Sequence, residues 1–169
     1  LTLSNRYDNS SVLSEGNQGA FFPAASVAWQ LDRENFFRNQ SIFSAARVRA
    51  GFGRVGNASI APYQTGGPLG FTNYNWGNGT AAIGSAPTTF ATPNLTWEKT
   101  ATTNIGLEFG LLKGRITGVI DLYKSTTTDE LQNRTIPAAN GVSNVYLNLG
   151  EVSNKGIELA LNTTIIDNK

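Results

Sequence analysis

The sequence predicts an all-β fold of antiparallel strands joined by long loops. Charged residues make up only 15% of the 169 residues, and 18 glycines accompany abundant Asn, Thr and Ser. Apolar and polar residues alternate with a period of two along much of the chain, which is typical of strands with two different faces. By itself, this alternation fits two architectures equally well: part of a transmembrane β-barrel and a soluble β-sandwich.

The composition excludes several functional classes from this segment. The net charge of +1 offers no strong field for nucleic acid, so no nucleic-acid partner is expected. Cysteine and histidine are both absent, which removes disulfides, Cys-based zinc sites, Ser-His-Asp triads and imidazole acid–base catalysis. We therefore expect neither an enzyme nor a bound cofactor. Methionine is also absent, so we expect the chain to be a processed product, an excised fragment or a part of something longer.

Six segments carry the strand pattern. The clearest is 103–111, where Ile105, Leu107 and Phe109 alternate with Glu108 and two glycines. A tight turn at Lys113-Gly114 should join it to the next strand as a hairpin. The six predicted strands are 1–7, 20–31, 45–55, 103–111, 115–131 and 145–163. The best helical candidate, 31–43, lacks a clean apolar stripe.

The connections alternate between short and long. Short ones are expected near 32–41 and 111–115, and long ones at 10–19, 56–96 and 132–144. Residues 56–93 contain four prolines and are expected to be irregular. Short turns at one rim and long extracellular loops at the other are typical of an outer-membrane barrel.

Aromatic residues fall into two groups. Those near strand ends are candidates for the interfacial girdles of a barrel: Phe21, Trp29, Phe43, Trp97, Phe109 and Tyr123. Phe71, Tyr74 and Trp76 lie within the long loop and are candidates for contact with a ligand or partner. The alternative role for this second group is to pin the loop to its neighbours.

The glycines Gly51, Gly53 and Gly56 match the dinucleotide-binding spacing G-x-G-x-x-G. That fingerprint requires a helix directly after the glycines, but the following residues contain Pro62 and Pro68. We therefore interpret the glycines as relief of crowding where a strand bends into its loop.

Several local motifs resemble one family. They are FFPAASVAW at 21–29, RVRAGFGRVGN at 47–57, PNLTWEKT at 93–100, TNIGLEFG at 103–110, DLYK at 121–124 and NLGEVSNKGIEL at 148–159. In this order they resemble the later barrel strands of the SusC-like TonB-dependent transporters. Gly51-Phe52 departs from the family, in which a Ser-Tyr pair is commoner.

This resemblance implies that residues 1–169 are part of one TonB-dependent receptor β-barrel domain, with about six strands of a 22-stranded antiparallel barrel. The plug domain and the remaining strands would lie outside this chain. The implied function is active import of an oligosaccharide or peptide cargo across the outer membrane of a Bacteroidetes bacterium. The implied partners are a SusD-like surface lipoprotein, outer-membrane lipid, and the TonB complex through parts outside this chain. The alternative is a soluble β-sandwich module that binds carbohydrate.

Within a barrel, the polar faces of the strands would enclose water. The candidates to face this lumen are Arg47, Arg49, Glu108, Asp121, Tyr123 and Glu158. They could contact the plug or guide cargo, or the charged ones could simply pair across strands. On a lipid face each arginine would cost about 2–4 kcal/mol at the bilayer midplane, whereas a wet lumen tolerates it.

Overall fold

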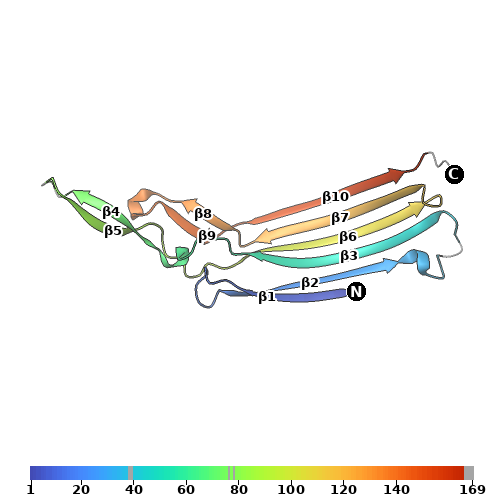
Figure 1. The fold of residues 1–169 in the computed structure, drawn as a ribbon, viewed down its shortest axis with the longest axis horizontal. Coiled ribbons are helices and arrows are strands. Elements are labelled where there is room, and N and C mark those ends of the chain that lie inside the picture. Colours follow the sequence, from blue (N-terminus) through green and yellow to red (C-terminus); the bar gives the residue numbers. More distant parts are fainter. Residues whose placement is uncertain (38–39, 76, 78, 166–169) are drawn as a thin grey trace.

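The computed structural model describes residues 1–37, 40–75, 77 and 79–165 as strands with short helices and loops (Figure 1). The strands are β1 (Thr2–Asn9), β2 (Gly19–Gln30), β3 (Phe43–Asn57), β4 (Leu69–Asn75), β5 (Ala81–Pro87), β6 (Glu98–Leu111), β7 (Ile116–Thr128), β8 (Leu131–Thr135), β9 (Asn144–Asn148) and β10 (Glu151–Thr163). The 3-10 helices are η1 (Leu31–Arg33), η2 (Gln64–Gly66) and η3 (Ala138–Asn140). In the described part of the chain, no helix is long and apolar enough to cross a membrane.

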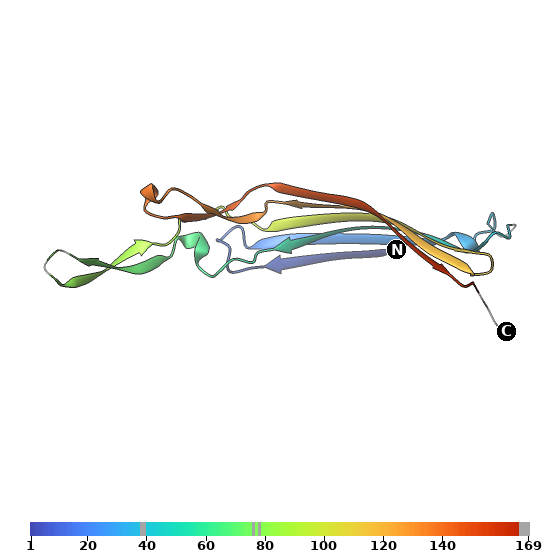
Figure 2. The ribbon, with the colours of Figure 1, turned by 90° about the horizontal axis from the view of Figure 1, so that it is seen from above.

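The six long strands form one antiparallel sheet in the order β1-β2-β3-β6-β7-β10. This confirms the six strands predicted from the alternation. The sheet is a single curved layer, and the described residues place no second sheet against either face (Figure 2). The chain therefore does not form a β-sandwich. Its short connections lie at one end of the sheet and its long ones at the other (Figure 1).

Two small hairpins extend beyond the long-loop end of the sheet (Figure 1). They pair β4 with β5 and β8 with β9. The prediction of an irregular stretch over 56–93 is therefore wrong in part, because it contains the β4–β5 hairpin. The predicted strands 115–131 and 145–163 are also each interrupted. The breaks occur at Asp129 and Gly150, whose φ angles of 56° and 89° are incompatible with an extended strand.

The described residues between β2 and β3 contain only the short helix η1, so no regular helix forms in the described part of 31–43. Instead, a carboxylate oxygen of Asp32 accepts a 3.4 Å hydrogen bond from the Ala46 backbone N–H. Next to it, the register with β6 shifts between Phe43 and Ala45. This bulge places Phe43 opposite Leu111 and hence on the apolar face of the sheet.

The register gives the sheet two chemically different faces. Residues directly opposite one another in neighbouring strands lie on the same face of the sheet. We call one side the apolar face; its apolar side chains include Val27, Trp29, Val48, Ile105, Leu107, Ile120, Leu122, Ile157 and Leu159. Its large side chains are open to the surroundings, with Ile157 74% exposed and Leu159 63% exposed. The opposite side, the polar face, carries all six predicted lumen-facing residues.

The best-buried hydrophobic cluster lies where the long loops meet the sheet. Leu13, Phe22, Leu95 and Trp97 pack together there, all at most 8% exposed. The rings of Phe22 and Trp97 meet edge to face at 5.4 Å, and the indole N–H of Trp97 donates to the Gln18 carbonyl at 2.9 Å. Trp97 is therefore a loop anchor, and its expected place in an interfacial girdle is wrong.

We expect Trp97→Ala to loosen the loops without abolishing the sheet. The change removes a buried side chain and typically costs about 3–5 kcal/mol in a core, and it leaves Leu13 and Leu95 facing a cavity. Limited proteolysis of the whole membrane-embedded protein should then cleave faster within residues 10–18 and 91–97. Trp97→Phe, which keeps most of the packing, serves as the control. Equal cleavage rates in all three proteins would contradict the anchoring role.

Candidate functional site

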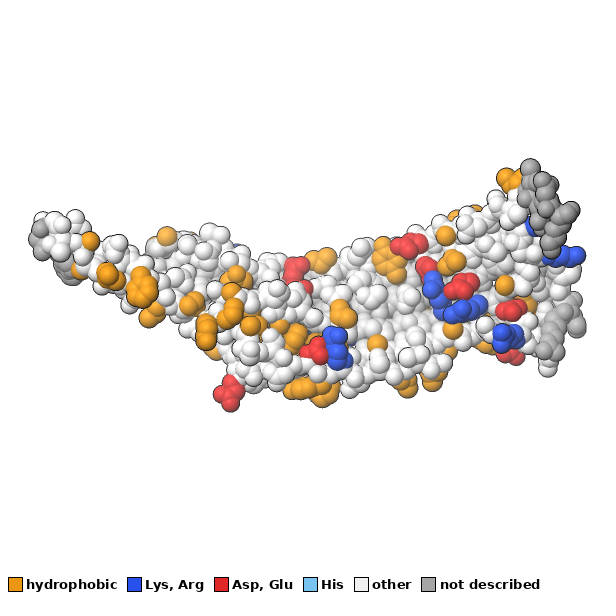
Figure 3. Space-filling model, viewed as in Figure 1, with side chains coloured by type: hydrophobic (Ala, Val, Ile, Leu, Met, Phe, Trp, Pro, Cys, Tyr) orange, Lys and Arg blue, Asp and Glu red, His pale blue; other side chains and the backbone are white. Residues whose placement is uncertain are grey.

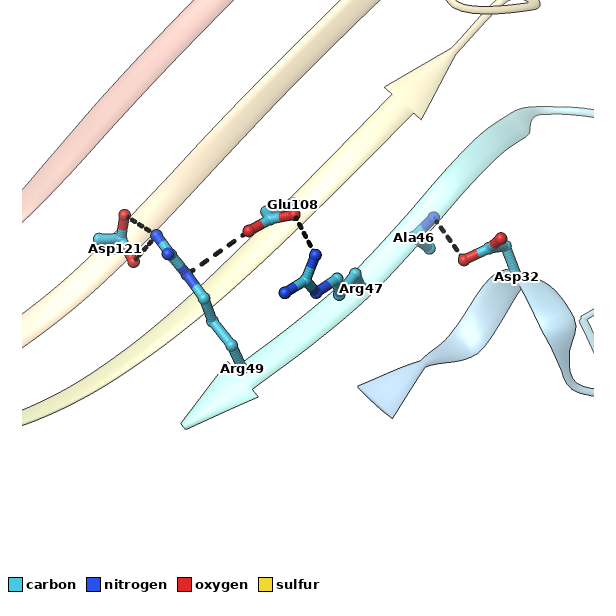
Figure 4. A network of polar contacts seen from close by, with 6 residues as sticks. All are labelled: Asp32, Ala46, Arg47, Arg49, Glu108 and Asp121. Carbon is cyan, nitrogen blue, oxygen red and sulfur yellow. Dashed lines mark hydrogen bonds and ion pairs between the residues drawn. The ribbon is translucent and has the colours of Figure 1, made fainter. Parts of the chain in front are cut away.

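A charged network crosses the polar face over three neighbouring strands (Figure 4). Arg49 on β3 reaches over β6 to Asp121 on β7, with both carboxylate oxygens within 2.8 Å of its Nη2. Glu108 on β6 lies between the two arginines, 3.6 Å from Arg47 Nη1 and 3.7 Å from Arg49 Nε. Acidic and basic side chains accordingly lie side by side on this face in Figure 3. Two positive charges are balanced by two negative ones.

Gly106 makes the long Arg49–Asp121 contact possible. The register places Gly106 between Arg49 and Asp121, so the arginine side chain crosses directly above it. A Cβ at position 106 would collide with Arg49 Nε and with an Asp121 carboxylate oxygen. A side chain at position 106 would therefore displace the Arg49 and Asp121 side chains from this contact.

Glu158 and Tyr123 lie on the same face but outside this network. Glu158 on β10 is opposite Asp121 and is exposed, and no ion pair joins it to another described residue. Tyr123 lies across Gly156 of β10, where an added Cβ would come within 2.7 Å of the phenolic oxygen. Gly51 has a similar role, because the Asn104 side chain occupies the space that its Cβ would need. This close approach, rather than a bend into the loop, explains that glycine.

Two polar side chains fasten the long loops to one another. The Asn148 amide accepts from the Thr96 N–H at 2.8 Å and donates to the carbonyls of Thr96 and Asp129 at 2.9 and 2.8 Å. Glu98 accepts from the Leu131 N–H at 3.0 Å and from the Asn57 side chain at 3.2 Å. These contacts hold the base of the loops in one arrangement.

The β4–β5 hairpin presents two distinct surfaces. Phe71 is 91% exposed and shares its face with Leu69 and Ile83, which are 66% and 78% exposed. Tyr74 lies on the opposite face, across from Ala82, so it does not extend this apolar stripe. Trp76, the third predicted loop aromatic, lies outside the described residues. The projecting β4–β5 hairpin, which we call the arm, shows no acidic or basic side chain in Figure 3, because residues 55–97 contain none.

The sequence patterns placed the charged residues on the correct strands but missed their supporting residues. Gly106, Glu98 and Asn148 act through contacts with strands or loops distant in the sequence, and no local pattern predicts such contacts. Only their positions within the motifs TNIGLEFG, PNLTWEKT and NLGEVSNKGIEL could have indicated that these three residues matter. The described residues also contain no cluster of three or more Cys, His, Asp or Glu side chains that could hold a metal ion.

A single-layer antiparallel sheet with one exposed apolar face, one charged face, short turns at one end and long loops at the other is a segment of an outer-membrane β-barrel. Residues 1–165 match the model of the family described as TonB dependent receptor-like, beta-barrel. The chain belongs to this family of outer-membrane proteins of Gram-negative bacteria. In this segment the barrel is not closed.

Named relatives support the same assignment. The chain is 39% identical over 164 residues to TonB-dependent receptor P26 of Formosa agariphila, covering 97% of this chain and 16% of that protein. It is 36% identical over 175 residues to TonB-dependent receptor SusC of Bacteroides thetaiotaomicron, covering 100% of this chain and 17% of SusC. The chain thus spans about a sixth of the length of these relatives.

Solved structures of similar fold come from the RagAB peptide importer. In its closed-closed state the TM-score is 0.85 at 30% identity, and the match covers 99% of this chain and 18% of that chain. In its open-open state the TM-score is 0.82 at the same identity. The SusC-like identity expected from the motifs is therefore confirmed.

We expect Asp121→Ala to destabilise the barrel more than Glu158→Ala. Asp121 makes a two-oxygen contact with Arg49, whose Nε is buried and has no hydrogen-bond partner among the described residues, whereas Glu158 makes no ion pair. Because the pair is partly exposed, a loss of about 1 kcal/mol is expected. The denaturant midpoint of the full receptor in detergent measures the difference. Gly106→Ala should reproduce the Asp121→Ala effect, and equal midpoints for all variants would argue against the network.

Proposed function

We propose that the chain forms barrel wall and extracellular loops of a SusC-like TonB-dependent transporter that actively imports an oligosaccharide or peptide. The observation that carries this proposal is the separation of apolar and charged side chains onto opposite faces of one sheet layer. A polypeptide that crosses hydrocarbon must pair its backbone groups internally, and a barrel wall does so while presenting different side chains to lipid and to water.

The apolar face is assigned to lipid. Phe21 and Trp29 lie on this face of β2, about 26 Å apart along the strand at roughly 3.3 Å per residue. This spacing suits girdles that flank an apolar band of about 25 Å, although strand tilt reduces its height. Aromatic neighbours accompany both: Tyr7 lies 4.8 Å from Phe21, and Phe36 lies 6.2 Å from Trp29 between ring centroids.

The polar face is assigned to the lumen. Arg47, Arg49, Glu108 and Asp121 largely neutralise one another, so this group is suited to stiffening the wall where it meets the plug. Glu158 and Tyr123 remain outside the network. They are the stronger candidates to touch plug residues or passing cargo.

The loops are assigned to the external mouth. The apolar stripe of Phe71, Leu69 and Ile83 on an uncharged arm suits contact with a SusD-like surface lipoprotein or with cargo. Tyr74, on the other face of the arm, would contact a different surface. TonB would act through parts outside this chain. Similarity to the RagAB peptide importer favours a peptide cargo, and the resemblance of the motifs to SusC-like transporters leaves oligosaccharides as the second candidate cargo.

Uptake measurements test the function directly. Deleting the gene should abolish growth on, or accumulation of, one cargo class when labelled oligosaccharides and peptides are supplied separately. Restoring the full gene should restore uptake, and only in cells with an intact TonB system. Uptake of both classes unchanged by the deletion would refute the transport proposal.

A matched pair of substitutions on β10 tests which face meets lipid. Leu159→Arg should impair membrane assembly, because an arginine at the lipid face costs about 2–4 kcal/mol near the midplane. Ala160→Arg places the same charge on the adjacent residue, which is exposed on the polar face, and should assemble normally. The yield of folded protein in the outer-membrane fraction measures this. Equal yields for both variants would overturn the assignment of faces.

A further inference from the structure

The charges of the apolar face gather at its long-loop end. The charged residues that the described strands of the main sheet place on this face are Arg54, Lys99, Lys124, Glu151 and Lys155. Four of them are cations and one is an anion. Further along the same strands, toward the short turns, the face is apolar. The positive charge therefore marks one border of the apolar band.

Two of these cations lie directly opposite each other. Lys124 on β7 pairs in register with Lys155 on β10, and both side chains are exposed. Neither makes an ion pair with another described residue, whereas Lys99 lies 3.5 Å from an Asp129 carboxylate oxygen. Like charges directly opposite in a sheet destabilise it. A negative ligand between the two ammonium groups would remove this repulsion.

An apolar groove begins at the two lysines. It has a volume of about 660 Å³, and its lining includes Ile105, Leu122 and Ile157 together with Thr103 and the lysines. The three apolar side chains form one row across β6, β7 and β10, one step closer to the centre of the apolar band. On the other side of the lysines, the Thr126 and Ser153 hydroxyls lie 3.4 Å apart on the same face. Apolar side chains, then the two ammonium groups, then the two hydroxyls thus follow one another along the strands.

We propose that this Lys124–Lys155 groove binds a phosphorylated glycolipid of the outer leaflet. Its phosphate lies between the two ammonium groups, an acyl chain lies along Ile105, Leu122 and Ile157, and its sugar lies near Thr126 and Ser153. The inference rests on the proposed function, because it requires the apolar face to lie in the membrane with its long-loop end outward. Cargo has no access to this groove, since cargo passes the opposite face.

The test uses the full receptor, purified in detergent and stripped of lipid, and titrated with lipid A carrying its phosphates or with dephosphorylated lipid A. At about fivefold per lysine, the double variant Lys124→Gln with Lys155→Gln should raise the dissociation constant for the phosphorylated form about 25-fold. Binding of the dephosphorylated form should not change. Lys113→Gln, in the turn at the other end of the sheet, removes the same charge and should bind like the unaltered protein. Native mass spectrometry measures the bound fraction.

Three results would overturn the proposal. They are equal binding of both lipids, insensitivity of phosphorylated-lipid binding to the two substitutions, and displacement of the lipid by an equal concentration of inorganic phosphate. If the double variant does not assemble, the unaltered protein still decides, because added salt should weaken binding of the phosphorylated form alone. If the receptor still inserts normally into the outer membrane, any of these results would leave the transport proposal intact. Equal yields of Leu159→Arg and Ala160→Arg would instead contradict the assignment of faces on which both the transport and the glycolipid proposals rest.

Discussion

The rest of the structure depends on antiparallel backbone pairing continued across six strands. Each inner strand pairs its N–H and C=O groups with both neighbouring strands, which is the condition for a single-layer wall to lie in hydrocarbon. This pairing also fixes the register, and a slip of one residue would carry every side chain to the opposite face. The separation of Leu107 from Glu108, or of Leu159 from Ala160, exists only because the register is held over the whole length of each strand.

The strand period was sufficient to predict the main sheet and its two faces. It failed where side chains stop alternating. Residues 69–87 combine Gly, Asn, Thr and Ala with few large apolar residues, so the β4–β5 hairpin shows no clear alternation of apolar and polar residues. Its strands are held by pairing between two uncharged segments, which is a property of the backbone more than of the side-chain pattern.

Contacts between distant segments were the other source of error. Trp97 has the aromatic character of a girdle residue, but its partners Leu13 and Phe22 lie far away in the sequence and become neighbours only when the loops fold over the rim. The Asn148 amide likewise bonds a backbone 52 residues away. A local pattern identifies which face of a strand a side chain occupies, yet it cannot state which loop will cover that face.

The same register explains why the two faces use cations differently. On the polar face, Arg47 and Arg49 meet carboxylates on adjacent strands, where a planar guanidinium can engage two oxygens at once. On the apolar face, Lys124 and Lys155 have no such carboxylates opposite them. Their flexible stems can pack along hydrocarbon while the ammonium groups extend toward a polar layer. With the apolar face assigned to lipid, as proposed, such a placement of cations is tolerated only at a border between lipid and water, which the proposal puts at the two lysines.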